Sequence, residues 1–194
     1  MFISTSVLKK HMKKAYDTGF LHIGNKEEGL FISTGHIAVW IDNEYIPNKV
    51  KALVMEFAGT LPDIDSVFRV SKAEPTPQYE LNQEYFYLRD MWNKYKIPCT
   101  RTKVHIDLCE SHEVFQNNKS KNLSIVRDDN LALIDLGEID YDYENLPTGP
   151  STMFGGQFMW SNATCKLLIT ANKMPEDNKV LETLQLINFE EVMK

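Results

Sequence analysis

The stretch MFISTSVLKKHMKKAYDTGFLHIGNKEEGLFISTG, residues 1–35, decides the fold, because its hydrophobic spacing changes from a helical period to short strands. Four apolar side chains recur at i, i+4, i+7 and i+8, as on one face of an α-helix. They are Leu8, Met12, Ala15 and Tyr16. Gly19 suits the C-terminal end of that helix, and residues 20–42 then indicate strands separated by turns at 25–29 and 34–35.

Further along the first half, Pro47 suits the first turn of a second helix, which Gly59 ends. Its apolar stripe comprises Val50, Leu53, Val54 and Phe57. A strand is predicted at 66–72. The segment AEPTPQ, residues 73–78, has the composition of a linker. An aromatic helix is predicted over about 82–96, with one side formed by Tyr85, Leu88, Trp92 and Tyr95.

From residue 99 onward the pattern changes to strands separated by turn residues. The predicted strands lie at 103–109, 123–126, 131–141, 156–160, 166–171 and 180–187, with a glycine- and proline-rich loop at 145–156. The expected fold class is α+β, with about three helices and a mostly antiparallel sheet. The expected units are an N-terminal helix–strand unit at 1–72, the linker at 73–78, and an aromatic helix plus sheet at 79–194. The alternative is that both units pack as one domain.

The composition is that of an ordinary globular protein, with 43% hydrophobic and 25% charged residues. The net charge is −6, and it is distributed unevenly. Residues 1–14 carry four lysines and no acid, so the remaining 180 residues carry −10. This balance argues against general adhesion to nucleic acid or anionic lipid, but it leaves room for a local basic surface.

The basic residues of the first helix are the leading functional candidates. Lys9, Lys10, Lys13 and Lys14 fall largely opposite the apolar face. Lysines on one helix face can contact phosphates without reading base sequence, so these four residues are the predicted nucleic-acid-binding residues. The alternative is an ordinary solvated helix face.

Metal and nucleotide chemistry have weaker signals. No glycine-rich loop stands between a strand and a helix, which argues against an NTPase or a classical dehydrogenase. The cysteine and histidine spacings in residues 99–112 match no common zinc module. A third hypothesis is a metal-dependent hydrolase that uses His105, Asp107 and His112. The alternative is that these residues belong to an ordinary polar strand face. No cofactor is predicted, and an enzyme is the less favoured class.

Two further segments have features of a surface. The carboxylates Glu138, Asp140, Asp142 and Glu144 alternate along a predicted strand, where their spacing of about 7 Å keeps all four from gripping one ion. They are read as a solvated face, with a partner-binding acidic surface as the alternative. The loop at 145–160 carries Phe154, Phe158 and Trp160, which would be the contact surface of a small-molecule or protein binding module.

Cysteine usage and terminal composition bear on the compartment. Cys99, Cys109 and Cys165 are an odd number with no regular spacing, which indicates free thiols in a reducing environment. The N-terminal residues lack the apolar core of a signal peptide, and no apolar run is long enough for a membrane span. The expected location is the cytoplasm, without membrane contact.

Two segments resemble the bacterial DNA sliding clamp, the processivity subunit of the replicative polymerase. Residues 1–35 look like the start of a clamp domain, with a short strand, a helix containing LKK, and strands with a glycine-led turn. Residues 166–186, KLLITANKMPEDNKVLETLQL, are similar to a clamp hairpin. In that family, helices line a central hole with lysine and arginine. The resemblance implies a non-enzymatic clamp-like fold, DNA or a replication protein as partner, and a homo-oligomeric ring.

Overall fold

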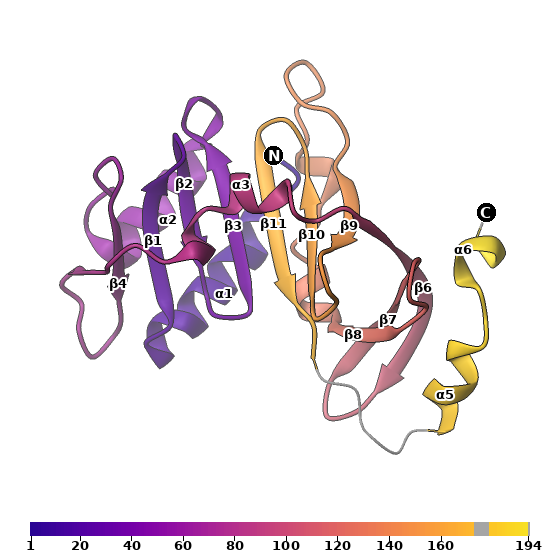
Figure 1. Cartoon of the computed structure of the whole chain (residues 1–194). Helices are drawn as coiled ribbons and strands as arrows, with labels where there is room; N and C mark the ends of the chain where they lie inside the picture. The colour runs from indigo at the N-terminus through magenta and orange to yellow at the C-terminus, as the bar shows by residue number, and fades with distance from the viewer. Residues whose placement is uncertain (173–178, 194) are drawn as a thin grey trace.

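One antiparallel sheet of eleven strands organises the computed structural model, which describes residues 1–172 and 179–193 (Figure 1). The strand order is β5-β4-β1-β2-β3-β11-β10-β9-β6-β7-β8. The strands are β1 Leu21–Lys26, β2 Gly29–Ser33, β3 Ile37–Asp42, β4 Val67–Val70, β5 Gln78–Tyr79, β6 Ile97–Asp107, β7 Ser111–Asn117, β8 Leu123–Arg127, β9 Thr148–Thr152, β10 Gln157–Ser161 and β11 Cys165–Thr170.

Helices are short apart from the first two. The α-helices in the described residues are α1 Thr5–Thr18, α2 Asn48–Ala58, α3 Leu88–Trp92, α4 Asp128–Leu131, α5 Lys179–Gln185 and α6 Phe189–Val192. Three 3₁₀ turns accompany them, η1 Asn43–Tyr45, η2 Glu84–Phe86 and η3 Leu136–Glu138. The α+β class with a large antiparallel sheet is therefore confirmed, while the prediction of about three helices is wrong, because the described residues form six.

The two long helices lie side by side on one face of the β4-β1-β2-β3 region (Figure 1). Their apolar stripes supply core residues, namely Leu8, Met12, Ala15, Val50, Leu53 and Val54. The rings of Tyr16 and Phe57 meet between them at 5.5 Å. The opposite face is covered by the segment around α3, which packs Phe86 and Leu88 against Trp40. Helices on both faces explain why β2 and β3 are buried almost throughout.

The other end of the sheet bends sharply at β6. This strand pairs with β9 only through Ile97 and Pro98, and then continues into a long hairpin with β7. The β6-β7-β8 region curls until an isolated bridge joins Ile125 of β8 to Asn172, just after β11. Phe115 of β7 fills the inside of the curl. Its ring lies 5.0 Å from that of Phe158 and 6.2 Å from that of Trp160.

Most predictions for residues 1–72 agree with this structure, but the short strand expected before the first helix is only a single bridge at Ile3, and α1 begins at Thr5. The first helix spans Thr5–Thr18 and ends at Gly19, whose φ of +82° is the left-handed conformation that glycine adopts without strain. The next three strands turn at the expected places. The second helix follows Pro47 and ends at Gly59.

Three predicted elements are wrong. The aromatic helix expected at 82–96 is broken into η2 and the five-residue α3, because contacts with the sheet hold its aromatic side chains. The strand expected at 131–141 is instead the end of α4, η3 and irregular chain, apart from one bridge between Ile134 and Ile3. The residues expected as a strand at 180–187 form helix α5. Residues 173–178, which include the turn residues expected between the predicted strands at 166–171 and 180–187, lie outside the described residues.

The loop at 145–156 is partly regular, since β9 lies within it. Residues 1–72 and 79–194 both contribute strands to the same sheet, and β5 begins at the last residue of the predicted linker, Gln78. None of the helices in the described residues is long and apolar enough to cross a membrane.

Candidate functional site

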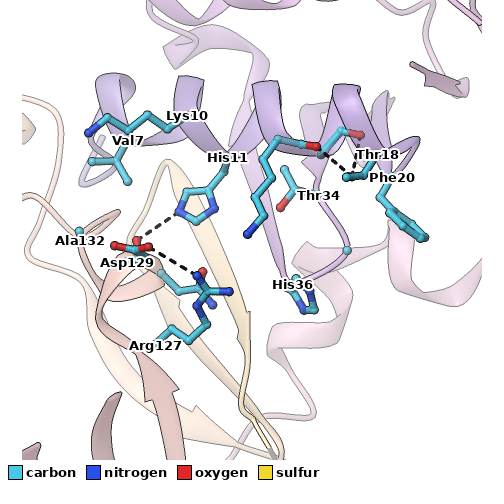
Figure 2. A pocket seen from close by; sticks show the side chains of 14 residues that line it. Val7, Lys10, His11, Thr18, Phe20, Thr34, His36, Arg127, Asp129 and Ala132 are labelled. Atoms are coloured by element: carbon cyan, nitrogen blue, oxygen red, sulfur yellow. Dashed lines mark hydrogen bonds and ion pairs between the residues drawn. The ribbon is translucent and has the colours of Figure 1, made fainter. Parts of the chain in front are cut away.

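A groove of about 640 Å³ runs along one side of α1 (Figure 2). One wall is a helical stripe spaced by three or four residues, which consists of Val7, Lys10, His11, Lys14, Ala15 and Thr18. This stripe extends over almost the whole helix, about 16 Å at 1.5 Å per residue. The volume falls within the range of ligand-binding cavities.

The opposite wall is assembled from segments distant in sequence. The β2–β3 turn contributes Thr34, Gly35 and His36, and the end of β8 with α4 contributes Arg127 and Asp129. Backbone hydrogen bonds fix both segments. Thr34 N–H donates to Ile37 O over 3.0 Å, which closes the turn. The start of the chain is tied to the region after α4, because Ser4 N–H donates to Leu133 O over 2.8 Å.

Charge is distributed unequally between the two walls. Arg127 donates from Nη2 to Glu110 Oε1 over 2.7 Å, and the same nitrogen lies 3.5 Å from Asp129 Oδ2, so neighbouring carboxylates offset its charge. On the α1 wall, no ion pair is found for Lys10 or Lys14 among the residues that the structure describes. The positive charge open to a ligand therefore lies on the helix side.

His11 lies across the groove from the α4 region. Its Nε2 is 3.1 Å from the backbone oxygen of Asp129, as the dashed line in Figure 2 shows. Burial lowers the pKa of His11, and the hydrogen bond with Asp129 opposes that shift only in part. At neutral pH the imidazole is therefore uncharged, and the lysines supply the positive charge of this wall.

Phe20 marks the end of the groove away from Lys10 (Figure 2). Gly19 turns the chain at the end of α1, and Phe20 N–H donates to Ala15 O over 2.9 Å. The aromatic side chain emerges from this turn with 59% of its surface exposed. Single exposed apolar side chains are ordinary on protein surfaces, and Phe154 and Leu81 are exposed as well, so what sets Phe20 apart is its place at the end of the groove.

The four predicted lysines are all exposed on α1, but they do not have the same surroundings. Lys10 and Lys14 line the groove. Lys9 points to the neighbouring helix, where its Nζ lies 2.8 Å from Glu56 Oε2. Lys13 is exposed outside the groove lining.

The proposed metal residues are held by different partners. His105 Nδ1 lies 3.2 Å from Asp128 Oδ2, whereas His112 is buried on β7 with Nδ1 2.7 Å from the backbone oxygen of Glu110. Asp107 is exposed at the end of β6. Throughout residues 1–172 and 179–193, no three histidine, cysteine or acidic side chains are grouped as metal ligands would be.

The aromatic residues of the second hypothesis do not share an exposed surface. Phe158 and Trp160 are core residues with 2% and 4% of their surface exposed, because β10 turns both toward Phe115. Phe154 lies in the β9–β10 turn and is 86% exposed. Phe154 therefore faces solvent, whereas the other two aromatic residues expected in the contact surface do not.

The carboxylate run is not a strand face, so that prediction is wrong. Glu138, Asp140 and Asp142 are exposed in η3 and the following turns, but Glu144 is buried. Its carboxylate pairs with the N-terminal amine of Met1 and accepts a hydrogen bond from the Thr164 hydroxyl. Glu144 is thus a structural residue rather than part of a surface.

Sequence reasoning assigned Lys10 and Lys14 to a site but not the other residues of the groove, among them His11, Phe20, His36 and Arg127. His11 stands within the lysine run, and Phe20 directly follows the helix-ending glycine, so both had a local signal. His36 and Arg127 had none, because their proximity to α1 depends on the sheet order.

Comparison with known proteins adds no relative. No family model matches the chain, and no curated protein and no solved structure is significantly similar to it.

Proposed function

We propose that this chain is a non-enzymatic, clamp-like protein that contacts DNA through the exposed face of its two long helices. The observation that carries the proposal is the lysine face of α1, which is exposed beside a groove in an otherwise acidic chain. Lysines arranged in this way neutralise phosphates and release counterions, which favours binding without base specificity.

The helix layer as a whole supports this proposal. Helix α2 adds Lys49 and Lys51, so the two helices together carry six lysines and two acidic residues, Asp17 and Glu56. The whole chain carries −6, so positive charge is concentrated on this layer. A polarised molecule of this kind presents one face to a polyanion and repels it elsewhere.

The architecture supports the clamp-like part of the proposal. Two adjacent helices lie on one face of an antiparallel sheet (Figure 1), and five of their six lysines are exposed. In sliding clamps, helices that carry lysine and arginine likewise line the channel through which DNA passes. The second sequence segment adds less support, because residues 179–185 form a helix where a clamp hairpin has its second strand.

Replacing Lys10, Lys13 and Lys14 together with alanine is expected to weaken duplex DNA binding by at least about tenfold at about 50 mM salt. The slope of log K against log salt should become shallower by up to about 0.9 for each lysine that contacts a phosphate. Fluorescence anisotropy over a salt series measures both quantities. Lys9→Ala alone should have a smaller effect, because Glu56 already pairs with Lys9.

A matched control replaces Lys96, Lys103 and Lys119, which are exposed outside the helix layer and have no ion pair among the described residues, and it changes the net charge equally. This control should keep most of the DNA affinity. Equal losses in both triple variants would show that only bulk charge matters. Wild-type protein that ignores DNA, or an α1 variant that binds as well as wild type, would contradict the proposed function.

Oligomeric state tests the clamp-like architecture separately. We expect gel filtration with light scattering to show a closed homo-oligomer, because a ring around DNA would be built from several copies of this fold. A monomer that still binds DNA through the lysines would support the DNA-binding part of the proposal and contradict the ring.

A further inference from the structure

The groove along α1 has features that binding to the phosphates of duplex DNA does not require. It is a cavity rather than a flat face, and it has an exposed aromatic ring at one end and two lysines in its wall. We propose that this groove binds single-stranded nucleic acid, with phosphates against Lys10 and Lys14 and a base stacked on Phe20. This inference rests on the proposed function and deepens it by naming the form of the nucleic acid.

The spacing of the lysines suits a polyphosphate backbone. Lys10 and Lys14 are one helical turn apart, so their Cβ atoms are about 5–6 Å from each other on the same side of α1. The wall they belong to is about 16 Å long, several times the 3.4 Å rise per nucleotide of one DNA strand. A backbone that follows the exposed side of the helix therefore passes both ammonium groups, outside the contact that His11 makes with Asp129 across the groove.

The wall opposite α1 determines which side of the nucleic acid lies against the helix. Asp129 is exposed in the groove, and its carboxylate would repel a phosphate on that side. Arg127 cannot offset this repulsion freely, because Glu110 and Asp129 already engage its guanidinium. The phosphates are therefore expected along α1, with the bases directed toward Phe20 and the β2–β3 turn.

Phe20 distinguishes a single strand from a duplex. An aromatic side chain stacks on the face of an unpaired base, whereas the bases of a duplex already stack on one another. Gly35 lies beside Phe20, and its φ of +85° is a conformation that glycine adopts without strain; a Cβ atom there would only touch Phe20 Cβ, at an ordinary contact distance of 3.7 Å. His36 lies next to this glycine and completes the same end of the groove (Figure 2).

The test measures binding of an oligothymidylate of about 12 nucleotides, within the site sizes of single-strand binding proteins, and of a duplex of equal length. Phe20→Leu keeps an apolar side chain but removes the aromatic face. It should weaken single-strand binding by about tenfold and leave duplex binding within about twofold. Phe20→Tyr should retain single-strand affinity. Phe154→Leu, at a second exposed phenylalanine, is the matched control and should change neither affinity.

The outcomes separate this inference from the proposed function. Duplex binding that depends on the lysines, together with single-strand binding that is unaffected by Phe20→Leu, would overturn the inference and leave the proposed function. Thymidine monophosphate that binds as tightly as the oligonucleotide would also overturn it, because the groove would then be a pocket for one nucleotide. If neither the single strand nor the duplex bound in a way that depends on the lysines, the proposed function itself would be contradicted. Circular dichroism of each variant verifies that the fold is retained.

Discussion

Phe115→Ala is expected to lower the free energy of unfolding by about 3–5 kcal/mol, the typical cost of truncating a buried phenylalanine. Phe115 is fully buried on β7 and contacts Phe158 and Trp160, so its ring joins the curled β6-β7-β8 region to the rest of the sheet. Removing the ring leaves a cavity that the surrounding strands cannot close without moving the bend at β6. Urea unfolding followed by tryptophan fluorescence measures the change.

Two matched variants sharpen this prediction. Phe115→Leu keeps much of the buried volume and should cost less than Phe115→Ala. Phe154→Ala removes an equal ring from an exposed turn and should change stability by no more than about 0.5 kcal/mol. If Phe115→Ala and Phe154→Ala had equal effects, the curled region would not depend on this aromatic cluster.

Glu144→Gln is expected to cost about 2–3 kcal/mol at neutral pH, because it removes a buried carboxylate from its hydrogen-bonding partners. The carboxylate pairs with the Met1 amine and accepts hydrogen bonds from the Thr164 hydroxyl and the Asp140 amide. Burial by itself would raise the pKa of Glu144, but these hydrogen bonds and the positive amine outweigh burial and lower it below the ordinary value of 4.5.

The sign of this shift predicts a pH dependence. A carboxylate whose pKa is lower in the folded state stabilises the protein fully above its unfolded pKa, and this contribution is lost as the pH falls through the folded pKa. The stability difference between wild type and Glu144→Gln should therefore shrink below about pH 4.5 in urea unfolding. Glu138→Gln, at an exposed carboxylate nearby, is the control and should show little difference at any pH. A Glu144→Gln difference that stays constant on acidification would contradict the ionic role.

Elements with a complete local signal could be predicted from the sequence. Helix α1 has an apolar stripe, a lysine face and a terminal glycine, and each of these acts within a few residues. The strands β1 to β3 have turn residues at both ends. The exposure of the four lysines follows directly from the helical period.

Elements whose conformation depends on distant contacts could not be predicted. The aromatic residues at 85–95 repeat at a helical spacing, but Phe86 and Leu88 pack on Trp40 of the sheet and Tyr95 donates its hydroxyl hydrogen to Gln157 Oε1 over 2.7 Å. Ile134 pairs with Ile3, more than a hundred residues away. In these segments, tertiary contacts outweigh the weak preference of the local sequence.

The sequence by itself determined the helix that carries the lysines, the antiparallel strands behind it and the contrast between that helix and an acidic chain. Only the tertiary structure decided that Lys10 and Lys14 border a groove, that Lys9 is paired with Glu56, and that Phe158 and Trp160 are buried. The physical reason is the sequence distance over which each interaction acts. A periodic pattern records which face of an element is apolar, whereas the order of strands in the sheet sets which polar faces meet.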